Sequence, residues 1–347
     1  MPKKPPLTPP DKPIRTMQDL AAYVGLTRQT LSKYFRDPQS VNAKSRARIA
    51  EGIEHSGFRP NFFAANLKRR NSKVLGIIIP SAVDPFYMEL VERIEHHANE
   101  AGFFVIALSS GGRREQESEA MNRLRAINAA GVLIAPSGSH PPRLRARNTP
   151  PVVYLDSPVD DTSPFVGTDN RQSIAQIVTY LLQSGSPPCY LGMPAINHNA
   201  DSRREAYIKA MQEHNEQPRV LTLRGKLGWD FESYGYRNAA AHLRNGLPTD
   251  TILCANDRIA IGAQLAAWHG GRRVGKTADC NLRIAGHDDH PFSRYTSPPL
   301  TTIVQNTDLI ARHAVTNIRR ACGELDSDNS DEQRILVPAT LVIRESA

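Results

Sequence analysis

The stretch MQDLAAYVGLTRQTLSKYF, residues 17–35, decides the fold of the N-terminal part of the chain. Its first apolar residues recur at the spacing of one helix face, at Met17, Leu20, Ala21 and Val24. Thr16 is a suitable N-cap for this helix, and Gly25 can end it. Thr27 can cap a second helix over residues 28–35. Because a tight, glycine-bearing turn joins two short helices, we predict a helix-turn-helix whose second helix can lie in the major groove of DNA.

The positive charge of the chain is concentrated around this motif. The whole chain has a net charge of +8, but residues 1–73 hold 15 Lys and Arg against five acidic residues, and the remainder is net −2. This charge is spread through a patterned helical segment, which favours a surface for a polyanion over a solvated tail. Residues 1–15 are rich in proline and contain little that could pack, so we expect them to be disordered.

The helical pattern continues to about residue 68. Asn42 can cap a third helix over residues 43–56, which Gly57 ends. After the turn Arg59–Asn61, a short fourth helix can reach Lys68. We therefore assign residues 16–57 to a DNA-binding helix-turn-helix domain and residues 58–72 to a hinge helix and linker.

From residue 73 onward, short β-rich runs alternate with amphipathic helical segments. The predicted strands are 74–80, 103–109, 132–136, 152–155, 189–192, 220–223, 251–254 and 282–286. The predicted helices are 86–101, 114–130, 171–184, 203–215, 232–245 and 257–269. This alternation indicates parallel sheets with right-handed crossovers, and about 270 residues are enough for two α/β lobes.

Polar side chains follow several of the predicted strands. They are Ser81, Asp84, Ser109, Ser110, Ser137, Asp156, Asn256, Asp257, Asp288 and Asp289. Ligands of α/β folds bind beyond the carboxyl ends of the strands, where carboxylates and amides can pair with the hydroxyls of a polyhydroxylated ligand. Aromatic side chains could stack on a sugar face, namely Phe86, Tyr87 and Trp229. Each Asp or Asn could instead cap a helix or shape a turn, and we assign Asp257 to such a cap.

Other classes of protein find little support. No apolar run is long enough to cross a membrane, and the N-terminus lacks the apolar region of a secretory signal, so we expect a cytoplasmic protein. The four cysteines are scattered without disulfide or zinc spacing. No phosphate-binding glycine loop or hydrolase motif occurs, so we expect no enzyme activity, catalytic residue, cofactor or metal. We interpret His96–His97 as part of a solvated helix face, and the run 287–290 as a loop.

The chain resembles the lac repressor (LacI/GalR) family from about residue 16 to residue 345. The similar stretches are DLAAYVGLTRQTLSK (19–33), VNAKSRARI (41–49), GFRPNFFAANL (57–67), DPFY (84–87), VVYLD (152–156), AND (255–257), GHDD (286–289) and PPLTTI (298–303). This resemblance implies a helix-turn-helix headpiece, a hinge helix, and a two-lobed α/β core with parallel sheets similar to periplasmic binding proteins. The core at 73–345 would divide into an N-lobe at 73–170 plus 303–330 and a C-lobe at 171–302 plus 331–345.

The resemblance also implies two sets of DNA-binding residues. The first set begins the recognition helix and would reach the major groove, at Thr27, Arg28, Gln29 and Lys33. The second set lies in the hinge helix, which would enter the minor groove at the operator centre, at Asn61, Ala64 and Leu67. Leu67 would be the wedge between base steps, and Ala64 would allow close approach of the backbone. The ending Tyr34–Arg36 departs from the family pattern, so no operator sequence can be transferred.

The effector pocket implied by the resemblance draws on both lobes. Its expected residues are Phe86, Tyr87, Asp156, Arg203, Trp229, Asn256 and Asp288. The implied partners are a double-stranded DNA operator of near-palindromic sequence and a small-molecule effector, with a sugar or sugar derivative favoured and purines or sugar phosphates open. A homodimer is expected and a tetramer stays open. The alternatives are a sugar-binding transport protein, which the basic head disfavours, and a carbohydrate-acting enzyme, which lacks a nucleophile–base pair.

Overall fold

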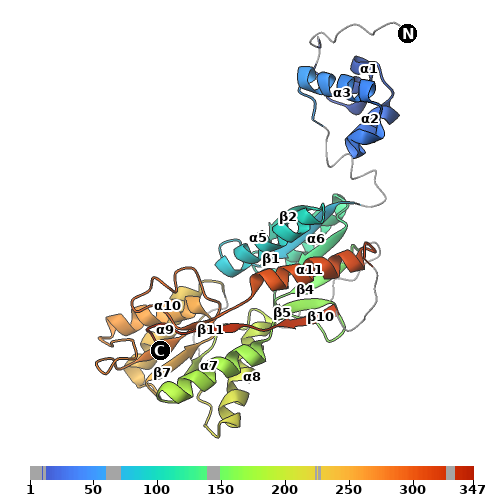
Figure 1. Cartoon of the computed structure of the whole chain (residues 1–347). Helices are drawn as coiled ribbons and strands as arrows, with labels where there is room; N and C mark the ends of the chain where they lie inside the picture. The colour runs from blue at the N-terminus through green and yellow to red at the C-terminus, as the bar shows by residue number, and fades with distance from the viewer. Residues whose placement is uncertain are drawn as a thin grey trace. The chain divides into compact units, whose positions relative to one another are not determined.

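The chain forms two compact units, Met1–Arg70 and Asn71–Ala347, each described here by itself. The computed structural model describes residues 10, 13–59, 72–138, 149–222, 225, 228–325 and 333–347. Most of the predicted tail at 1–15 and of the predicted hinge at 58–72 lies outside the described residues. Figure 1 shows the first unit in dark blue and the second from cyan to red.

The first unit contains the three helices that the sequence predicts. They are α1 (Met17–Val24), α2 (Arg28–Arg36) and α3 (Ala43–Ser56), with a 3-10 turn η1 (Pro38–Ser40) before α3. Thr16 and Asp19 form a capping box at the start of α1, in which the Thr16 hydroxyl accepts from the Asp19 N–H at 3.1 Å. Gly25 ends α1 in the left-handed conformation, so the chain turns sharply into α2.

A small apolar core holds these helices together. Leu20 and Val24 of α1, Leu31 of α2 and Ile49 of α3 are fully buried. The caps and this core explain why so short a segment has a defined shape, because each helix satisfies its first N–H groups locally and buries one face against the other two.

A parallel sheet forms the first lobe of the second unit. Its strands are β1 (Val74–Ile79), β2 (Phe104–Ser109), β3 (Gly131–Ile134), β4 (Val152–Leu155), β5 (Phe165–Thr168) and β10 (Arg334–Val337). Within the described residues the strand order is β2-β1-β3-β4-β5-β10, and every pairing is parallel. Both faces are covered: α5 (Pro85–Glu100) and α11 (Thr307–Ala321) pack on one face, and α6 (Arg114–Ala126) packs on the other (Figure 1).

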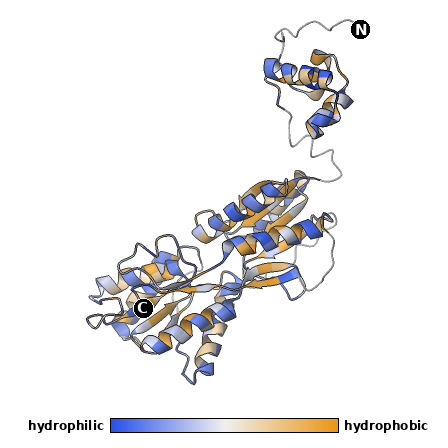
Figure 2. Cartoon of the chain, viewed as in Figure 1, coloured by the Kyte–Doolittle hydropathy of each residue, from blue (hydrophilic) through white to orange (hydrophobic). Residues whose placement is uncertain are grey.

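Strand β1 shows why this sheet is buried on both faces. Leu75 and Ile77 belong to the cluster under α5 and α11, whereas Val74 and Ile78 belong to the cluster under α6. Successive side chains of a strand point to opposite faces, so an almost continuous apolar run serves both clusters. Figure 2 shows the matching pattern, with apolar strands and helices that are apolar on one side only.

The second lobe is built on another parallel sheet. Its strands are β6 (Cys189–Leu191), β7 (Thr251–Cys254) and β8 (Arg283–Ala285). Its helices are α7 (Asn170–Ser184), α8 (His198–Glu213), α9 (Phe231–Asn245) and α10 (Asp257–His269). A short antiparallel pair, β9 (Thr302–Val304) with β11 (Thr340–Val342), packs with this lobe through Ile303 and Leu341.

The predicted C-lobe segment at 331–345 needs a correction. Arg334–Val337 pairs in parallel with Phe165–Thr168 and therefore belongs to the first lobe. Only the following strand, Thr340–Val342, lies in the second lobe with β9. RILV was not among the predicted strands, and its sheet membership depends on the path of the chain between lobes, which a local pattern does not contain.

Several other boundaries differ from prediction. Helix α8 begins at His198, five residues before the predicted start, because Asn197 caps it through a bond from the Ala200 N–H. The strand predicted at 220–223 is reduced to an isolated bridge between Val220 and Tyr190 over its described residues. β5 and α11 were not among the predicted elements. Among the described residues, no helix combines the length and apolar character needed to cross a membrane.

Candidate functional site

The predicted DNA-reading side chains lie at the exposed start of α2. Thr27 caps the helix, with its hydroxyl accepting from the Thr30 N–H at 3.2 Å, and Arg28, Gln29 and Lys33 are all exposed. The helix is held from behind by buried Leu31. A rigid helix with exposed Arg and Gln at its N-terminal end can present these groups to base edges. The predicted hinge residues Asn61, Ala64 and Leu67 lie outside the described residues.

The seven predicted effector residues line one pocket between the two lobes. It is lined by Asp84, Phe86, Tyr87, Asp156, Met193, Asn197, Asn199, Arg203, Trp229, Phe231, Asn256, Asp288 and Gln305. Phe86 and Tyr87 begin α5, and Asp156 follows β4, so these three belong to the first lobe. Arg203, Asn256 and Asp288 come from α8, the cap of α10 and the residues after β8. The carboxyl ends of parallel strands from both lobes therefore face one cavity.

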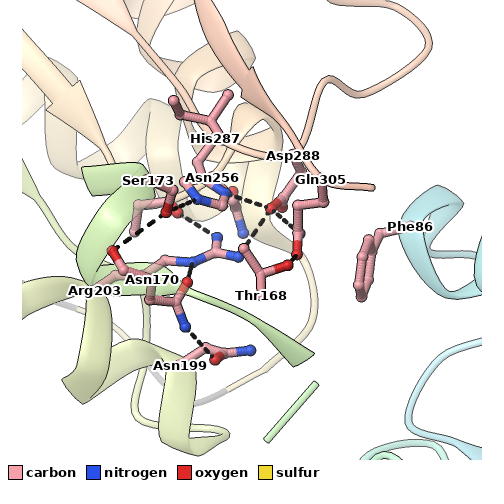
Figure 3. A network of polar contacts seen from close by, with 12 residues as sticks. Phe86, Thr168, Asn170, Ser173, Asn199, Arg203, Asn256, His287, Asp288 and Gln305 are labelled. Atoms are coloured by element: carbon pink, nitrogen blue, oxygen red, sulfur yellow. Dashed lines mark hydrogen bonds and ion pairs between the residues drawn. The ribbon is translucent and has the colours of Figure 1, made fainter. Parts of the chain in front are cut away.

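Arg203 is the centre of a buried hydrogen-bond network, drawn in Figure 3. Its Nε donates to Asn170 Oδ1 at 3.0 Å, Nη1 to the Ala255 carbonyl at 2.7 Å, and Nη2 to Asp288 Oδ1 at 3.0 Å. Burial opposes its charge, but the neighbouring Asp288 and Asp156 carboxylates raise the pKa of Arg203 above its usual value. The guanidinium is thus charged, fixed in direction and matched to acidic neighbours.

Asp288 receives three donors at one carboxylate oxygen. Besides Arg203, they are Gln305 Nε2 at 2.8 Å and His287 Nδ1 at 2.9 Å. Burial would raise the pKa of Asp288, but the charge of Arg203 and the bond from His287 lower it. The backbone of Asp288 has φ of 114°, a strained conformation for a residue with a side chain. The network holds Asp288 ionised in that conformation.

His287 stands behind this pair as a neutral group. It is fully buried, and its Nε2 lies 3.0 Å from the Ser173 hydroxyl. Burial, together with the charge of Arg203, lowers the pKa of His287 to about 4. A neutral imidazole can donate from Nδ1 to Asp288 without adding a charge to the site.

A tyrosine–aspartate pair lies on the first-lobe side. The Tyr87 hydroxyl donates to Asp156 Oδ2 at 2.8 Å, and both side chains are buried. Burial raises the pKa of Asp156, while Arg203 and the Tyr87 bond lower it in part. Asp156 also has positive φ, 61°. Two of the pocket carboxylates therefore sit in backbone conformations that side-chain bonds must maintain.

Aromatic rings form the remaining wall. The centroid of Tyr87 lies 5.2 Å from that of Phe86 and 6.0 Å from that of Trp229, and Trp229 lies 5.7 Å from Phe231. Figure 3 shows Phe86 on α5 facing the polar network from across the pocket. One polar wall opposite one aromatic wall is an arrangement suited to a ligand with hydroxyls on its edge and an apolar face.

The assignment of Asp257 as the cap of α10 is wrong. Asn256 is the cap, because its side chain accepts from the Ile259 N–H at 2.9 Å. Asp257 is fully buried and accepts from Ser293 Oγ at 2.6 Å, Thr302 Oγ1 at 2.5 Å and the His290 N–H at 2.9 Å. Burial raises its pKa to about 7. Asp257 thus fixes the segment after Asp288 rather than the helix start.

The interpretation of His96–His97 as a solvated face holds for only one of the two. The His96 side chain is 65% exposed, but that of His97 is 15% exposed and its Nε2 lies 2.9 Å from Asp308 Oδ1 of α11. Nitrogen atoms of both histidines and a carboxylate oxygen of Glu100 lie within 4.8 Å of one another, close enough to surround an ion. The His97–Asp308 bond joins α5 to α11 and accounts structurally for His97.

The sequence did not single out several polar residues of the pocket. Asn170, Asn197, Asn199 and Gln305 hold or line it, and Asn170 Nδ2 donates to Asn199 Oδ1 at 2.8 Å. The available signals were weak: Asn197 and Asn170 lie at the starts of helices, and Gln305 follows a short strand. Such positions are filled by Asn and Gln for local reasons in most proteins, so only the fold identifies these four.

Comparisons with known proteins identify the two parts of the chain. A family model for periplasmic binding proteins and the sugar-binding domain of the LacI family matches residues 72–342. The model for bacterial regulatory proteins of the lacI family matches residues 16–61. The chain belongs to the LacI family. It is therefore a DNA-binding transcription regulator with a periplasmic-binding-like domain, and the expectation that it is not an enzyme is confirmed.

Similar proteins span nearly the whole of this LacI-family chain. The HTH-type transcriptional repressor CytR of Escherichia coli (strain K12) is 27% identical over 86% of the chain and 87% of that protein. The Ribose operon repressor of the same strain is 25% identical over 96% of the chain and 99% of that protein. The structure of the lac repressor dimer bound to operator and the anti-inducer ONPF has a TM-score of 0.80 at 24% identity, covering 96% of this chain and 99% of that one. The predicted fold class is confirmed.

Proposed function

We propose that this protein is a transcriptional repressor that binds a near-palindromic DNA operator as a homodimer and responds to a polyhydroxylated effector in its pocket. The observation that carries the proposal is one chain with both an exposed recognition helix and a buried polar pocket shared by two lobes. The positively charged N-terminal helix-turn-helix unit favours a regulator over a transport protein or an enzyme with the same core. We place its action in the cytoplasm, where such operators are found.

The DNA contacts follow from the exposed side chains. Arg28 suits the O6 and N7 acceptors of guanine, and Gln29 suits the N6 and N7 groups of adenine. Lys33, one turn further along α2, suits a phosphate. We propose that Asn61, Ala64 and Leu67 act in a hinge helix at the operator centre, with Leu67 between two base pairs.

Exposed apolar side chains favour dimerisation of the core with a second copy of the chain. Met88 and Phe292 are 45% and 67% exposed, and Met88 lines one hollow with Pro291, which precedes Phe292. Tyr295 is 77% exposed on the same connecting segment, and Trp268 on α10 is 72% exposed. A contiguous apolar patch, such as Met88 forms with Pro291, is typical of an interaction surface. The similar lac repressor structure is a dimer, which favours this assignment.

The charges of the pocket favour an effector without an anionic group. Asp84 and Asp156 line it and are buried, and Asp288 lines it half-buried, whereas Arg203 is its lining cation and already donates to three protein acceptors. The three lining carboxylates outnumber the two neighbouring cations, Arg203 and Arg258, so a phosphate or carboxylate would meet an excess of negative charge at low dielectric. Carboxylates and amides accept and donate well to neutral hydroxyls, so we propose a neutral sugar or polyol and not a sugar phosphate.

The response would work through lobe closure. An effector that binds one closure state better than the other shifts the core by that difference in affinity, and the shift changes how the two hinge segments of a dimer present themselves to DNA. Couplings of this kind are typically about 1–3 kcal/mol. The sense of the response is left to experiment, because induction and corepression use the same parts.

A DNA-binding titration with added sugars tests this function. The full chain is titrated into a fluorescent duplex chosen from a random library by the protein, against a scrambled duplex, and then into the same duplex with single neutral sugars and polyols. We expect at least about tenfold preference for the chosen duplex, and a change in that affinity of about fivefold or more with one sugar. Equal affinity for both duplexes would refute the DNA part, and a DNA-selective chain that no neutral sugar affects or stabilises would refute the effector part.

A further inference from the structure

One ion pair crosses between the lobes at the side of the pocket. Arg258, the second residue of α10 in the second lobe, donates from Nη1 to Asp84 Oδ2 of the first lobe at 3.0 Å. The two side chains are 12% and 10% exposed. An ion pair this well buried is sensitive to any change in the distance between the lobes, since neither group can replace its partner with water without opening the cleft.

Arg258 is held rigidly on its own side before it meets the first lobe. Its Nε and Nη2 each donate to a different carboxylate oxygen of Glu232 at 2.7 Å, and its guanidinium lies 5.1 Å from the centre of the Phe231 ring. The two-point bond to Glu232 fixes the plane of the guanidinium, and Phe231 supports its face. Nη1 is therefore directed at the first lobe at little further entropic cost.

Asp84 is held equally well on the other side. It is the N-cap of α5, and its Oδ1 accepts from the Phe86 N–H at 3.1 Å. The same helix start carries Phe86 and Tyr87, which line the pocket. Arg258 lies beside Asn256 and Phe231, which line the pocket from the second lobe. The ion pair thus joins the two walls of the pocket directly.

A second cross-lobe contact lies at Gly112, in the loop between β2 and α6. Gly112 has φ of 70°, and a Cβ built there would lie 2.1 Å from Trp229 Nε1 and 2.9 Å from Trp229 Cδ1. The indole is a rigid ring packed between Tyr87 and Phe231, so it yields less readily than a flexible side chain. The lobes approach this closely only because residue 112 lacks a side chain. In this arrangement the pocket retains about 30 Å³ of space, which is too little for a sugar.

We propose that Arg258 is the positioning residue for lobe closure, that its bond to Asp84 holds the cleft shut, and that Gly112 provides the space for Trp229 in the shut state. The inference rests on the proposed effector pocket, and it names the contacts through which that pocket opens and closes. Any effector must break or remake the Arg258–Asp84 bond to move the lobes.

The two partners of the ion pair should not be equivalent. Burial raises the pKa of Asp84, and the Arg258 charge counteracts part of that rise. Without Arg258, a buried carboxylate would lack its cation, and opening the cleft is the simplest way to return it to water. Without Asp84, Arg258 still has Glu232, which is 43% exposed and shares its charge with solvent. Loss of the arginine should open the cleft more than loss of the aspartate.

Quenching of Trp229 fluorescence by acrylamide measures this opening without DNA or effector. The chain has two tryptophans, and the exposed Trp268 is replaced by Phe in all variants so that only Trp229 is read. For the full chain we expect Arg258→Met to raise the quenching constant at least about threefold and Asp84→Asn to raise it less than about twofold. The double variant should lie between Asp84→Asn and Arg258→Met, because the cross-lobe bond is absent but no buried carboxylate is left without its cation.

Matched substitutions separate closure from general damage. Arg273→Met breaks an exposed ion pair of the second lobe with Asp279 and should leave quenching unchanged. Gly112→Ala should open the cleft. Gly111→Ala should not, because its methyl group, on a similar backbone with φ of 60°, meets the flexible Gln116 side chain at 3.2 Å and the Arg113 guanidinium at 3.9 Å. Circular dichroism tests whether each variant is folded.

Two results would overturn the proposal. The first is a folded Arg258→Met chain with parent-like quenching, and the second is a double variant as open as Arg258→Met alone. If Arg258→Met unfolds the chain, the quenching constants of Gly112→Ala and Gly111→Ala are compared instead. Equal constants for these two variants would overturn the closure mechanism. The quenching measurements use neither DNA nor sugar, so a negative result would contradict the closure mechanism alone. The proposed repressor function is tested separately by the duplex titration.

Discussion

Arg28 at the start of α2 and Arg203 within α8 have the same charge in opposite surroundings. Arg28 is exposed on a short helix that packs by its other face on an apolar core. Arg203 is 3% exposed and donates to Asn170, Asp288 and the Ala255 carbonyl. The first is positioned by the helix beneath it, and the second by a polar network around it. A protein can therefore present charge to an external polyanion on a stable scaffold, whereas a pocket for a small ligand must satisfy every buried polar group from within.

The difference also separates stability from recognition. Removing an exposed recognition side chain should cost DNA affinity and little stability. Removing a member of the pocket network should cost stability of the core and the effector response, with the DNA-binding unit still folded, because the two units have separate cores.

The largest expected effect is that of Arg203→Met. It leaves the buried Asp156 and the half-buried Asp288 without their cation, and losing one partner of a buried ion pair costs about 3–5 kcal/mol. Urea unfolding of the full chain, followed by Trp229 fluorescence, measures this change. The adjacent Arg204→Met is the control, since Arg204 is exposed. Similar unfolding free energies for the two variants would show that the network is not a structural unit.

The second effect is the pH dependence of stability, to which two buried groups, His287 and Asp257, contribute with opposite signs. The pKa of folded His287 is about 4, below its usual 6.5, so the unfolded chain binds more protons and stability falls as pH drops from 6.5 to 4. The pKa of folded Asp257 is about 7, above its usual 3.8, so it adds stability over nearly the same fall in pH. Asp257→Asn removes the stabilising contribution of Asp257 at low pH. The loss of unfolding free energy between pH 7 and pH 4 should therefore be larger in the variant by about 3 kcal/mol. Urea titrations at pH 4, 5.5 and 7 test this, and parallel curves for the parent and variant would contradict it.

A smaller effect is expected at the recognition helix. Arg28→Ala should weaken binding to the preferred operator by about 1–3 kcal/mol and relax the choice of base at one position of each half-site. Anisotropy titrations against single-base operator variants measure this. Lys44→Ala on α3 removes an exposed charge outside α2 and serves as the control. An equal loss on every DNA sequence would mean that Arg28 contacts phosphate only.

The smallest effect separates neutral from anionic effectors. Thermal-shift titrations compare glucose with glucose 6-phosphate and ribose with ribose 5-phosphate. Where a neutral sugar binds, we expect its phosphate to bind at least about tenfold more weakly, which is about 1.4 kcal/mol. Asp156→Asn should reduce that difference by removing one buried carboxylate. Tighter binding of either phosphate would exclude the assigned effector class.

The sequence was sufficient for the parts of the structure that local chemistry determines. The caps Thr16, Thr27 and Asn42 begin the first three helices as predicted, because each satisfies N–H groups of its own helix. The polar residues after strands also converge as predicted for Asp156 and Asp288, since the carboxyl ends of the parallel strands of both lobes face one pocket.

The sequence was insufficient where partners come from distant segments. Gln305 reaches Asp288, and Asn170 reaches Arg203, across separations that no local pattern encodes. Arg258 and Asp84 are 174 residues apart. The same limit explains the misplaced strand Arg334–Val337 and the wrong assignment of Asp257 as a helix cap, because both depend on which elements become neighbours.

Selection of bound sequences from a random duplex library by the full chain tests the central claim most directly. A dimer with two exposed copies of α2 should enrich a near-palindromic sequence of two similar half-sites related by a two-fold axis, and Arg28→Ala should lose one conserved base position in each half. Enrichment of no sequence, or of a single half-site without symmetry, would contradict the account of this chain as a dimeric, sequence-reading repressor.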